Sequence, residues 1–139
     1  MAQASDVVLG QVGMTLDDVK LVVPHQANKR ILNALAKRIG IYEDKVIVNV
    51  HKYGNTSAGT IPVALCEAGE EGRIEPGDHI LMASFGAGLT YGASLIKWGG
   101  RTKPLKSSDA ELPHCDKTGL EIIAAHVERY RKRVSENGS

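Results

Sequence analysis

Hydrophobic residues gather in short blocks between residues 21 and 100, and the spacing inside each block predicts its secondary structure. Apolar runs rich in Val, Ile and Leu predict buried strands, whereas apolar residues repeated every three or four positions predict helices. The expected strands are 21–24, 46–50, 79–85 and 89–98, and the expected helices are 28–39, closed by Gly40, and the segment around 61–68. This alternation indicates an α/β fold with a mixed, mostly parallel sheet and a final antiparallel hairpin.

The segments on either side of this core differ from it in pattern. Residues 1–20 are expected to form a short lead-in, in which Gly10 and Gly13 prevent a helix. Residues 101–116 are expected to form a linker, followed by an amphipathic C-terminal helix over 117–134. The apolar stripe of that helix consists of Leu120, Ile123, Val127, Tyr130 and Val134. We therefore divide the chain into a lead-in at 1–20, a core at 21–100, and a linker with a tail helix at 101–139.

The expected core has fewer helices than its sheet needs. Strands that are apolar throughout require cover on both faces, and residues 21–100 supply only two convincing helices. We expect one face to be covered by another part of the structure. The tail helix is one candidate for this cover; binding a partner helix, or local packing without a specific role, is equally consistent with its pattern.

The composition excludes several classes of function. The chain has 139 residues, of which 42% are hydrophobic and 24% charged, and its formal net charge is +1. We expect neither a nucleic-acid nor a membrane partner, because the charge is balanced and no apolar run approaches the ~18 residues of a membrane span. Cys66 and Cys115 form no CxxC pair, so no metal or other cofactor is expected. Two lone cysteines and the lack of a signal-peptide pattern favour the cytoplasm.

Three loops whose side chains and backbone amides could bind a ligand follow the carboxyl ends of three expected strands. They are Pro24–Asn28, Tyr53–Ser57 and Phe85–Gly88. Ligands of open α/β sheets gather at these ends, so His25, Asn55 and the glycine-loop amides could donate hydrogen bonds to a carbonyl oxygen there. From the residues alone, a structural histidine and a turn-forming asparagine are the more common explanations of these two residues. The glycine loop precedes an expected strand rather than a helix, which argues against a dinucleotide site.

The same loops resemble one enzyme family. The strings VPHQANKRI at 23–31, YGNTSAG at 53–59 and FGAG at 85–88 are similar to the C-terminal part of β-ketoacyl-ACP synthase III. This family comprises the initiating condensing enzymes of type II fatty acid synthesis, which have a thiolase-like fold. The resemblance runs from about Thr15 to Trp98 and leaves the tail out. It implies a partial thiolase-like half-domain that acts with acyl carrier protein and acyl-CoA.

The resemblance also implies roles for individual residues. His25 and Asn55 match two of three catalytic residues, which hydrogen-bond the thioester carbonyl of malonyl-ACP as it loses carbon dioxide. The amide of Ala87 matches an oxyanion-hole donor, and Phe85 matches a residue lining the pocket near the acyl-cysteine. Arg30 matches a basic residue implicated in docking the carrier protein.

The charge pattern of the first expected core helix bears on docking independently. Lys29, Arg30, Lys37 and Arg38 are all basic, and Arg30 and Lys37 share one helix face because they lie seven residues apart. Such a stripe can steer an acidic partner, although an ordinary solvated face has the same composition.

The family's nucleophilic cysteine lies in its N-terminal half, which this sequence does not match. Cys66 is expected to be a small core residue, and Cys115 falls in the expected linker. The chain alone is therefore expected to be inactive and to need an N-terminal half, or to form a homodimer. Two alternatives remain: a non-catalytic fragment that self-associates or binds a carrier protein, and a related condensing enzyme of secondary metabolism.

Overall fold

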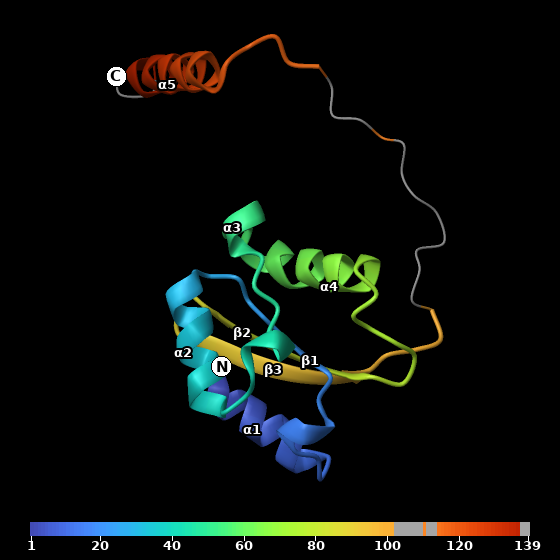
Figure 1. The fold of residues 1–139 in the computed structure, drawn as a ribbon. Helices are drawn as coiled ribbons and strands as arrows, with labels where there is room; N and C mark the ends of the chain where they lie inside the picture. Colours follow the sequence, from blue (N-terminus) through green and yellow to red (C-terminus); the bar gives the residue numbers. More distant parts are fainter. Residues whose placement is uncertain (102–109, 111–113, 137–139) are drawn as a thin grey trace. The chain divides into compact units, whose positions relative to one another are not determined.

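The computed structural model describes residues 1–101, 110 and 114–136. The described residues fall into two compact units, one within Met1–Leu105 and the other within Lys106–Ser139. The first unit contains a sheet with helices on its two faces, and the second contains one helix (Figure 1). Most of the expected linker lies outside the described residues. In the described part of the chain, no helix is both long enough and apolar enough to span a membrane.

The sheet has three strands in the order β1-β2-β3, formed by Leu21–Pro24, His79–Gly86 and Thr90–Lys97. Strand β1 runs parallel to β2 and pairs Leu21 with Ile80. Strand β3 runs antiparallel to β2 and returns directly after a turn. The expected parallel pair and final hairpin are confirmed.

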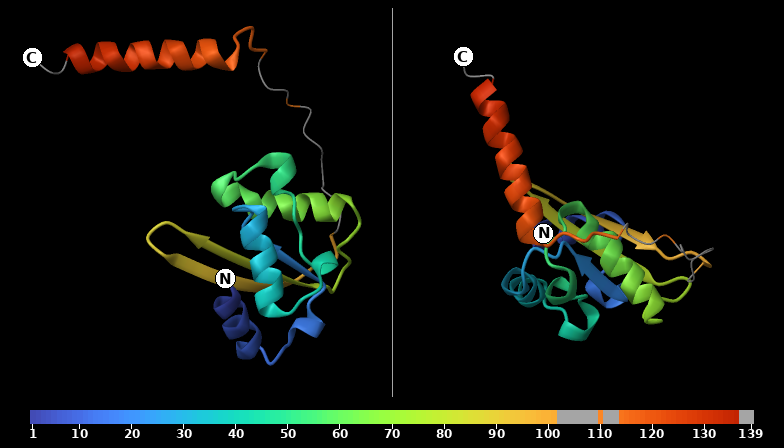
Figure 2. Two further views of the ribbon diagram at one scale, coloured as in Figure 1. Left: turned by 60° about the vertical axis from the view of Figure 1, so that its left-hand side comes forward. Right: turned by 90° about the horizontal axis from the view of Figure 1, so that it is seen from above.

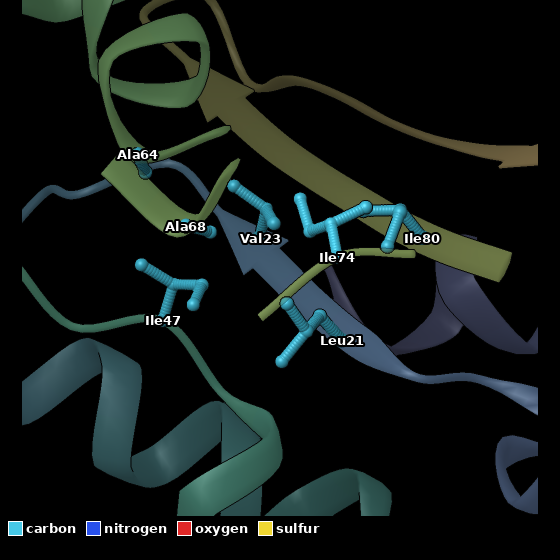
Figure 3. Close-up of a cluster of buried hydrophobic side chains, with 7 residues drawn as sticks. All are labelled: Leu21, Val23, Ile47, Ala64, Ala68, Ile74 and Ile80. Carbon is cyan, nitrogen blue, oxygen red and sulfur yellow. The ribbon is translucent and has the colours of Figure 1, made fainter. Parts of the chain in front are cut away.

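Helices cover both faces of this sheet. On one face, Ala64 and Ala68 of α4 (Thr60–Glu70) pack with Val23 and Ile80 of the strands (Figure 3). On the other face, α1 (Ala2–Gln11) and α2 (Lys29–Ile39) contribute Leu9 and Ala36 to a second apolar cluster. Figures 1 and 2 show α4 and α1 on opposite sides of the sheet. The first unit therefore covers both faces with its own helices, and part of this cover comes from α1, outside residues 21–100.

Helix α1 is the element that sequence reasoning missed. We expected Gly10 and Gly13 to prevent a helix, but Gly10 lies in the last turn of α1 and Gly13 follows the helix with φ +67°. A glycine in a helix costs about 1 kcal/mol, which is less than the burial of a leucine side chain contributes. Leu9 is 5% exposed and packs with the sheet, so tertiary contact outweighs the local preference.

The expected strand at 46–50 was wrong except at its first residues. Val46 forms an isolated parallel bridge with Val22, and the Ile47 N–H donates to the Val22 carbonyl. Beyond this point the chain leaves the sheet, and Val50 begins the short helix α3 (Val50–Tyr53). The backbone N–H groups of Asn49 and Val50 donate to the side chain of a buried glutamine instead of to a strand.

The tail unit contains α5 (Gly119–Glu136), close to the expected helix. Thr118 and Glu121 cap its start, because the Thr118 N–H donates to the Glu121 carboxylate and the Glu121 N–H donates to the Thr118 hydroxyl. The apolar stripe of α5 is exposed to solvent, with Leu120 at 80% and Tyr130 at 65% exposure.

Candidate active site

The parallel pairing of β1 and β2 places two of the three loops at one edge of the sheet. Strand β1 ends at Pro24 and β2 ends at Gly86, and parallel strands end at the same edge. The backbone N–H of His25 donates to the Ala83 carbonyl of β2 at 2.8 Å, which extends the pairing by one residue. His25 therefore leaves the sheet from a backbone position that β2 holds.

Gln26 ties the third loop to this edge. Its side chain is 1% exposed and makes four hydrogen bonds. The Nε2 group donates to the carbonyls of Pro24 and Ile47 at 2.9 and 3.0 Å. The Oε1 atom accepts from the backbone N–H groups of Asn49 and Val50 at 2.9 and 3.2 Å. One buried amide thus joins the loop that follows β1 to the segment that leads into α3 and Asn55.

The three loops enclose an open cleft of about 920 Å³. Four residues singled out from the sequence line it together, namely His25, Asn55, Phe85 and Ala87. Ser57 and Asn28 line it as well. Arg30 and Lys37 lie outside the cleft, and Lys29 lines a separate hollow beside Glu43 and Asp44.

His25 is held by one hydrogen bond and one aromatic contact. Its Nδ1 atom lies 2.7 Å from the hydroxyl oxygen of Thr60, the first residue of α4. Its ring meets Phe85 edge to face, with the ring centroids 5.6 Å apart and the ring planes at 72°. Thr60 is 35 residues away in the sequence and carries no motif that marks it, so sequence reasoning missed it.

The Asn55 side chain uses its oxygen within the loop and leaves its Nδ2 group for a ligand. Its Oδ1 atom accepts the Ser57 N–H at 3.0 Å, which closes a local turn. Ser57 has φ +56°, an unfavourable value for a residue other than glycine. The Asn55 Nδ2 group has no hydrogen-bond partner among the described residues and remains available to a ligand.

Ala87 belongs to the tight turn between β2 and β3. The turn uses positive φ values at Gly88 and Leu89, +84° and +46°. Ala87 is exposed at the cleft, and its backbone N–H has no partner within residues 1–101, 110 and 114–136. An unpaired amide at a cleft wall is the type of group that forms oxyanion holes.

Helix α2 carries the expected basic residues. Lys29, Arg30 and Lys37 are exposed, and none of them forms an ion pair within the described residues. The helix begins after Asn28, whose side chain accepts the Ile31 N–H at 3.0 Å. It contains no acidic residue, so every charged side chain that α2 itself carries is basic.

Neither cysteine belongs to the cleft. We expected Cys66 to be a core residue, but it is exposed on α4, where its thiol contacts the Glu70 carboxylate. The negative charge of Glu70 raises the pKa of the Cys66 thiol, which disfavours the thiolate that a nucleophile needs. Cys115 is also exposed. The described residues contain no cluster of His, Cys, Asp or Glu side chains suited to a metal ion.

Glu67 is a second residue that the sequence did not mark. It accepts hydrogen bonds from Asn49 Nδ2 at 2.9 Å and from Lys52, and it contacts Tyr53. The hydrogen bond from Lys52, followed by that from Asn49, lowers the pKa of the Glu67 carboxyl below its usual range. These contacts fasten α3, which directly precedes the Asn55 turn, to α4.

Comparison with known proteins identifies the family. Residues 9–98 match the family described as "3-Oxoacyl-[acyl-carrier-protein (ACP)] synthase III C terminal". The chain belongs to the 3-oxoacyl-ACP synthase III family. This finding confirms the resemblance drawn from the three loops.

Named relatives support the assignment. The chain is 49% identical over 136 residues to "Beta-ketoacyl-[acyl-carrier-protein] synthase III 2" of Vibrio cholerae, and covers 38% of that protein. It is 53% identical over 128 residues to the protein of the same name from Vibrio vulnificus, and covers 35% of it. A crystal structure of 3-oxoacyl-[acyl-carrier-protein] synthase III from Aquifex aeolicus superposes with a TM-score of 0.69 at 51% identity, over 70% of this chain and 32% of that one. The expected α/β, thiolase-like fold is confirmed.

One expectation about the tail is corrected. We expected residues beyond Trp98 to lie outside the resemblance, but the match to the Vibrio cholerae synthase covers 98% of this chain and therefore includes nearly all of the tail. The tail is thus shared with at least one synthase III relative. The chain as a whole spans little more than a third of the length of the curated relatives it matches first.

Proposed function

We propose that this chain supplies the histidine and asparagine of a decarboxylating condensing enzyme that acts in the initiation of fatty acid synthesis. His25 and Asn55 hydrogen-bond the thioester carbonyl of malonyl-ACP while it loses carbon dioxide. The observation that carries the proposal is that both side chains line one cleft, together with Phe85 and Ala87. Family membership and the names of the relatives support the reaction class.

The chemistry follows the movement of charge. When the bond to the carboxylate breaks, its electron pair moves into the thioester carbonyl and gives an enolate. Hydrogen-bond donors fixed at that oxygen stabilise the transition state more than the ground state, because the charge develops there. The enolate carbon then attacks the carbonyl carbon of an acyl thioester formed from acyl-CoA, and the Ala87 N–H stabilises the oxyanion of the resulting tetrahedral intermediate. Collapse of this intermediate breaks the C–S bond, releases the thiolate of that thioester and leaves the ketoacyl product. Phe85 lines the acyl site.

The acyl group needs a thiol that the described cleft does not contain. Neither Cys66 nor Cys115 is among the residues that line it. We therefore propose that the acyl-cysteine belongs to residues outside this sequence, as in the family. The isolated chain, given acyl-CoA and malonyl-ACP, is expected to form no ketoacyl product, and sustained turnover would contradict this proposal.

A complementation assay tests the proposed roles. The chain is joined to the preceding part of the Vibrio cholerae synthase, and carbon dioxide release and ketoacyl product are both measured. His25→Ala and Asn55→Ala are each expected to lower decarboxylation about 10²–10³-fold, the usual effect of removing one oxyanion donor. His51→Ala and Gln11→Ala serve as controls, because both residues are exposed and lie outside the cleft and outside α2. Wild-type rates in either cleft variant would overturn the assignment.

Carrier-protein docking on α2 is a related proposal, and it also defines a second candidate function, a non-catalytic carrier-binding module. Lys29, Arg30 and Lys37 form an exposed basic surface on the helix whose first turn borders the cleft. Acyl carrier proteins are acidic in this family, so such a surface raises the association rate. The carrier's pantetheine arm then enters the cleft from a neighbouring position.

Reversing the charge of single basic residues tests whether α2 binds the carrier protein or is only an exposed basic helix. Arg30→Glu and Lys37→Glu are expected to weaken carrier binding and to reduce its dependence on salt. Lys20→Glu is the control, because Lys20 is exposed just before β1, at the opposite end of that strand from His25. Equal binding by all three variants would remove the docking proposal. Binding without decarboxylation in the complemented enzyme would favour the carrier-binding module over the enzyme.

A further inference from the structure

Three hydrogen bonds connect Asn55 with His25 by way of the Ser57 backbone and the Thr60 hydroxyl. The Ser57 N–H donates to Asn55 Oδ1 at 3.0 Å, and the Ser57 carbonyl accepts from the Thr60 hydroxyl at 3.0 Å. The same hydroxyl oxygen lies 2.7 Å from His25 Nδ1. Thr60 is 2% exposed, so the two bonds at its hydroxyl are partly buried, whereas the bond between Ser57 and Asn55 is exposed. Both ends of the chain are side chains that line the cleft.

Counting the available protons shows which atom donates and which atom accepts in each of these hydrogen bonds. The Thr60 hydroxyl has one proton and lies between two acceptor positions, His25 Nδ1 and the Ser57 carbonyl, which also accepts the Thr60 backbone N–H. If Nδ1 carries a proton, it donates to Thr60 and Thr60 donates to Ser57, so both bonds form. If Nδ1 carries none, one of the two short contacts joins two lone pairs. The first arrangement is therefore favoured.

We propose that Thr60 is a positioning residue that holds neutral His25 in the tautomer protonated on Nδ1 and that, through Ser57, fixes the orientation of the Asn55 amide. This inference rests on the proposed function for its catalytic meaning, but it concerns the resting protein. Ser57 holds its unfavourable φ of +56° within this chain of bonds.

The two cleft residues then differ chemically. Asn55 offers its Nδ2 protons in every state, because its Oδ1 is already occupied by Ser57. Neutral His25 offers the cleft a lone pair on Nε2, and it donates from Nε2 only when the ring carries both protons. In that charged form its hydrogen bond to an enolate oxygen is charge-assisted and about twice as strong as a neutral one. Asn55 is the permanent donor of the pair, and His25 is the donor that depends on its protonation state.

The tautomer is measured on the 139-residue chain without substrate. Long-range ¹H–¹⁵N correlation spectra of the labelled protein, recorded under alkaline conditions in which histidine rings are neutral, distinguish a protonated from an unprotonated ring nitrogen. Wild type is expected to show protonated Nδ1 and unprotonated Nε2 at His25. Thr60→Val removes the hydroxyl at nearly constant volume and is expected to move the proton to Nε2, whereas Thr60→Ser keeps the hydroxyl and the wild-type tautomer.

Two outcomes overturn the proposal: protonated Nε2 at His25 in wild type, or a Thr60→Val spectrum identical to that of wild type at His25. His51 is exposed and serves as the internal reference, whose signals should not change. If Thr60→Val does not fold, the wild-type and Thr60→Ser spectra still decide the question. Loss of decarboxylation in the His25 and Asn55 variants tests the proposed function separately, so either claim can fail while the other stands.

Discussion

The buried amide of Gln26 offers the sharpest test of how the site is assembled. Replacing it with leucine keeps the volume but removes all four hydrogen bonds that join the His25 loop to residues 47–50. At a net contribution of about 1 kcal/mol for each bond, Gln26→Leu is expected to lose about 4 kcal/mol of unfolding free energy. This loss is a large fraction of the roughly 5–15 kcal/mol that stabilises an ordinary domain.

Urea unfolding followed by circular dichroism measures this loss, and amide hydrogen exchange locates it. For a slope of about 2 kcal/mol per molar urea, the midpoint is expected to fall by about 2 M. Exchange at the Asn49 and Val50 amides should accelerate more than exchange in β2, because their acceptor is the side chain that is removed. Gln11→Leu is the matched control at an exposed site and should change stability by less than about 0.5 kcal/mol. A Gln26→Leu variant as stable as this control would refute the reasoning.

Further predictions concern α3 and the helix ends. Glu67→Gln should destabilise the protein near neutral pH. Because the pKa of Glu67 is lowered in the folded state, its advantage over glutamine is present above the ordinary carboxyl pKa and should shrink as the pH falls through the folded value, as measured by urea unfolding across that range. Gly40→Ala should cost about 1–2 kcal/mol, because Gly40 ends α2 at φ +74°. Gly10→Ala should instead stabilise the protein by up to about 1 kcal/mol, because Gly10 lies within α1 and an added methyl group there meets no atom within 4 Å. Thermal melts that rank these two glycine variants in the opposite order would contradict the assigned α1 and α2 boundaries.

The hydrophobic pattern of the sequence predicts those helices and strands whose conformation depends mainly on neighbouring residues. The apolar runs predict the strands β1 and β2, the periodic apolar residues predict the helices α2 and α5, and all four elements are present. Residues 46–50 have the composition of a strand, but the Gln26 amide takes the backbone N–H groups of Asn49 and Val50 and ends the pairing. A side chain more than twenty residues away decides this conformation, and no local pattern reports it.

In the candidate site, too, local motifs predict some features, whereas residues distant in the sequence determine others. The motifs around His25, Asn55 and Phe85 indicated which residues would gather, and the cleft brings them together. The partners that orient them were not predictable, because Thr60 and Glu67 belong to α4, where their spacing marks only a helix. Cys66 was misplaced for a related reason: cysteine is usually buried, but this one falls on the solvent side of α4.

The central claim is that the His25 ring and the Asn55 amide act on one carbonyl group in one cleft. The most direct measurement is an NMR titration of the chain with a malonyl-pantetheine amide, in which nitrogen replaces the thioester sulfur and prevents turnover. The account predicts that the His25 ring and Asn55 Nδ2 signals shift together with a common dissociation constant, while those of His51 and Asn33 remain unchanged. Shifts confined to only one of the two residues, or different dissociation constants for them, would contradict it.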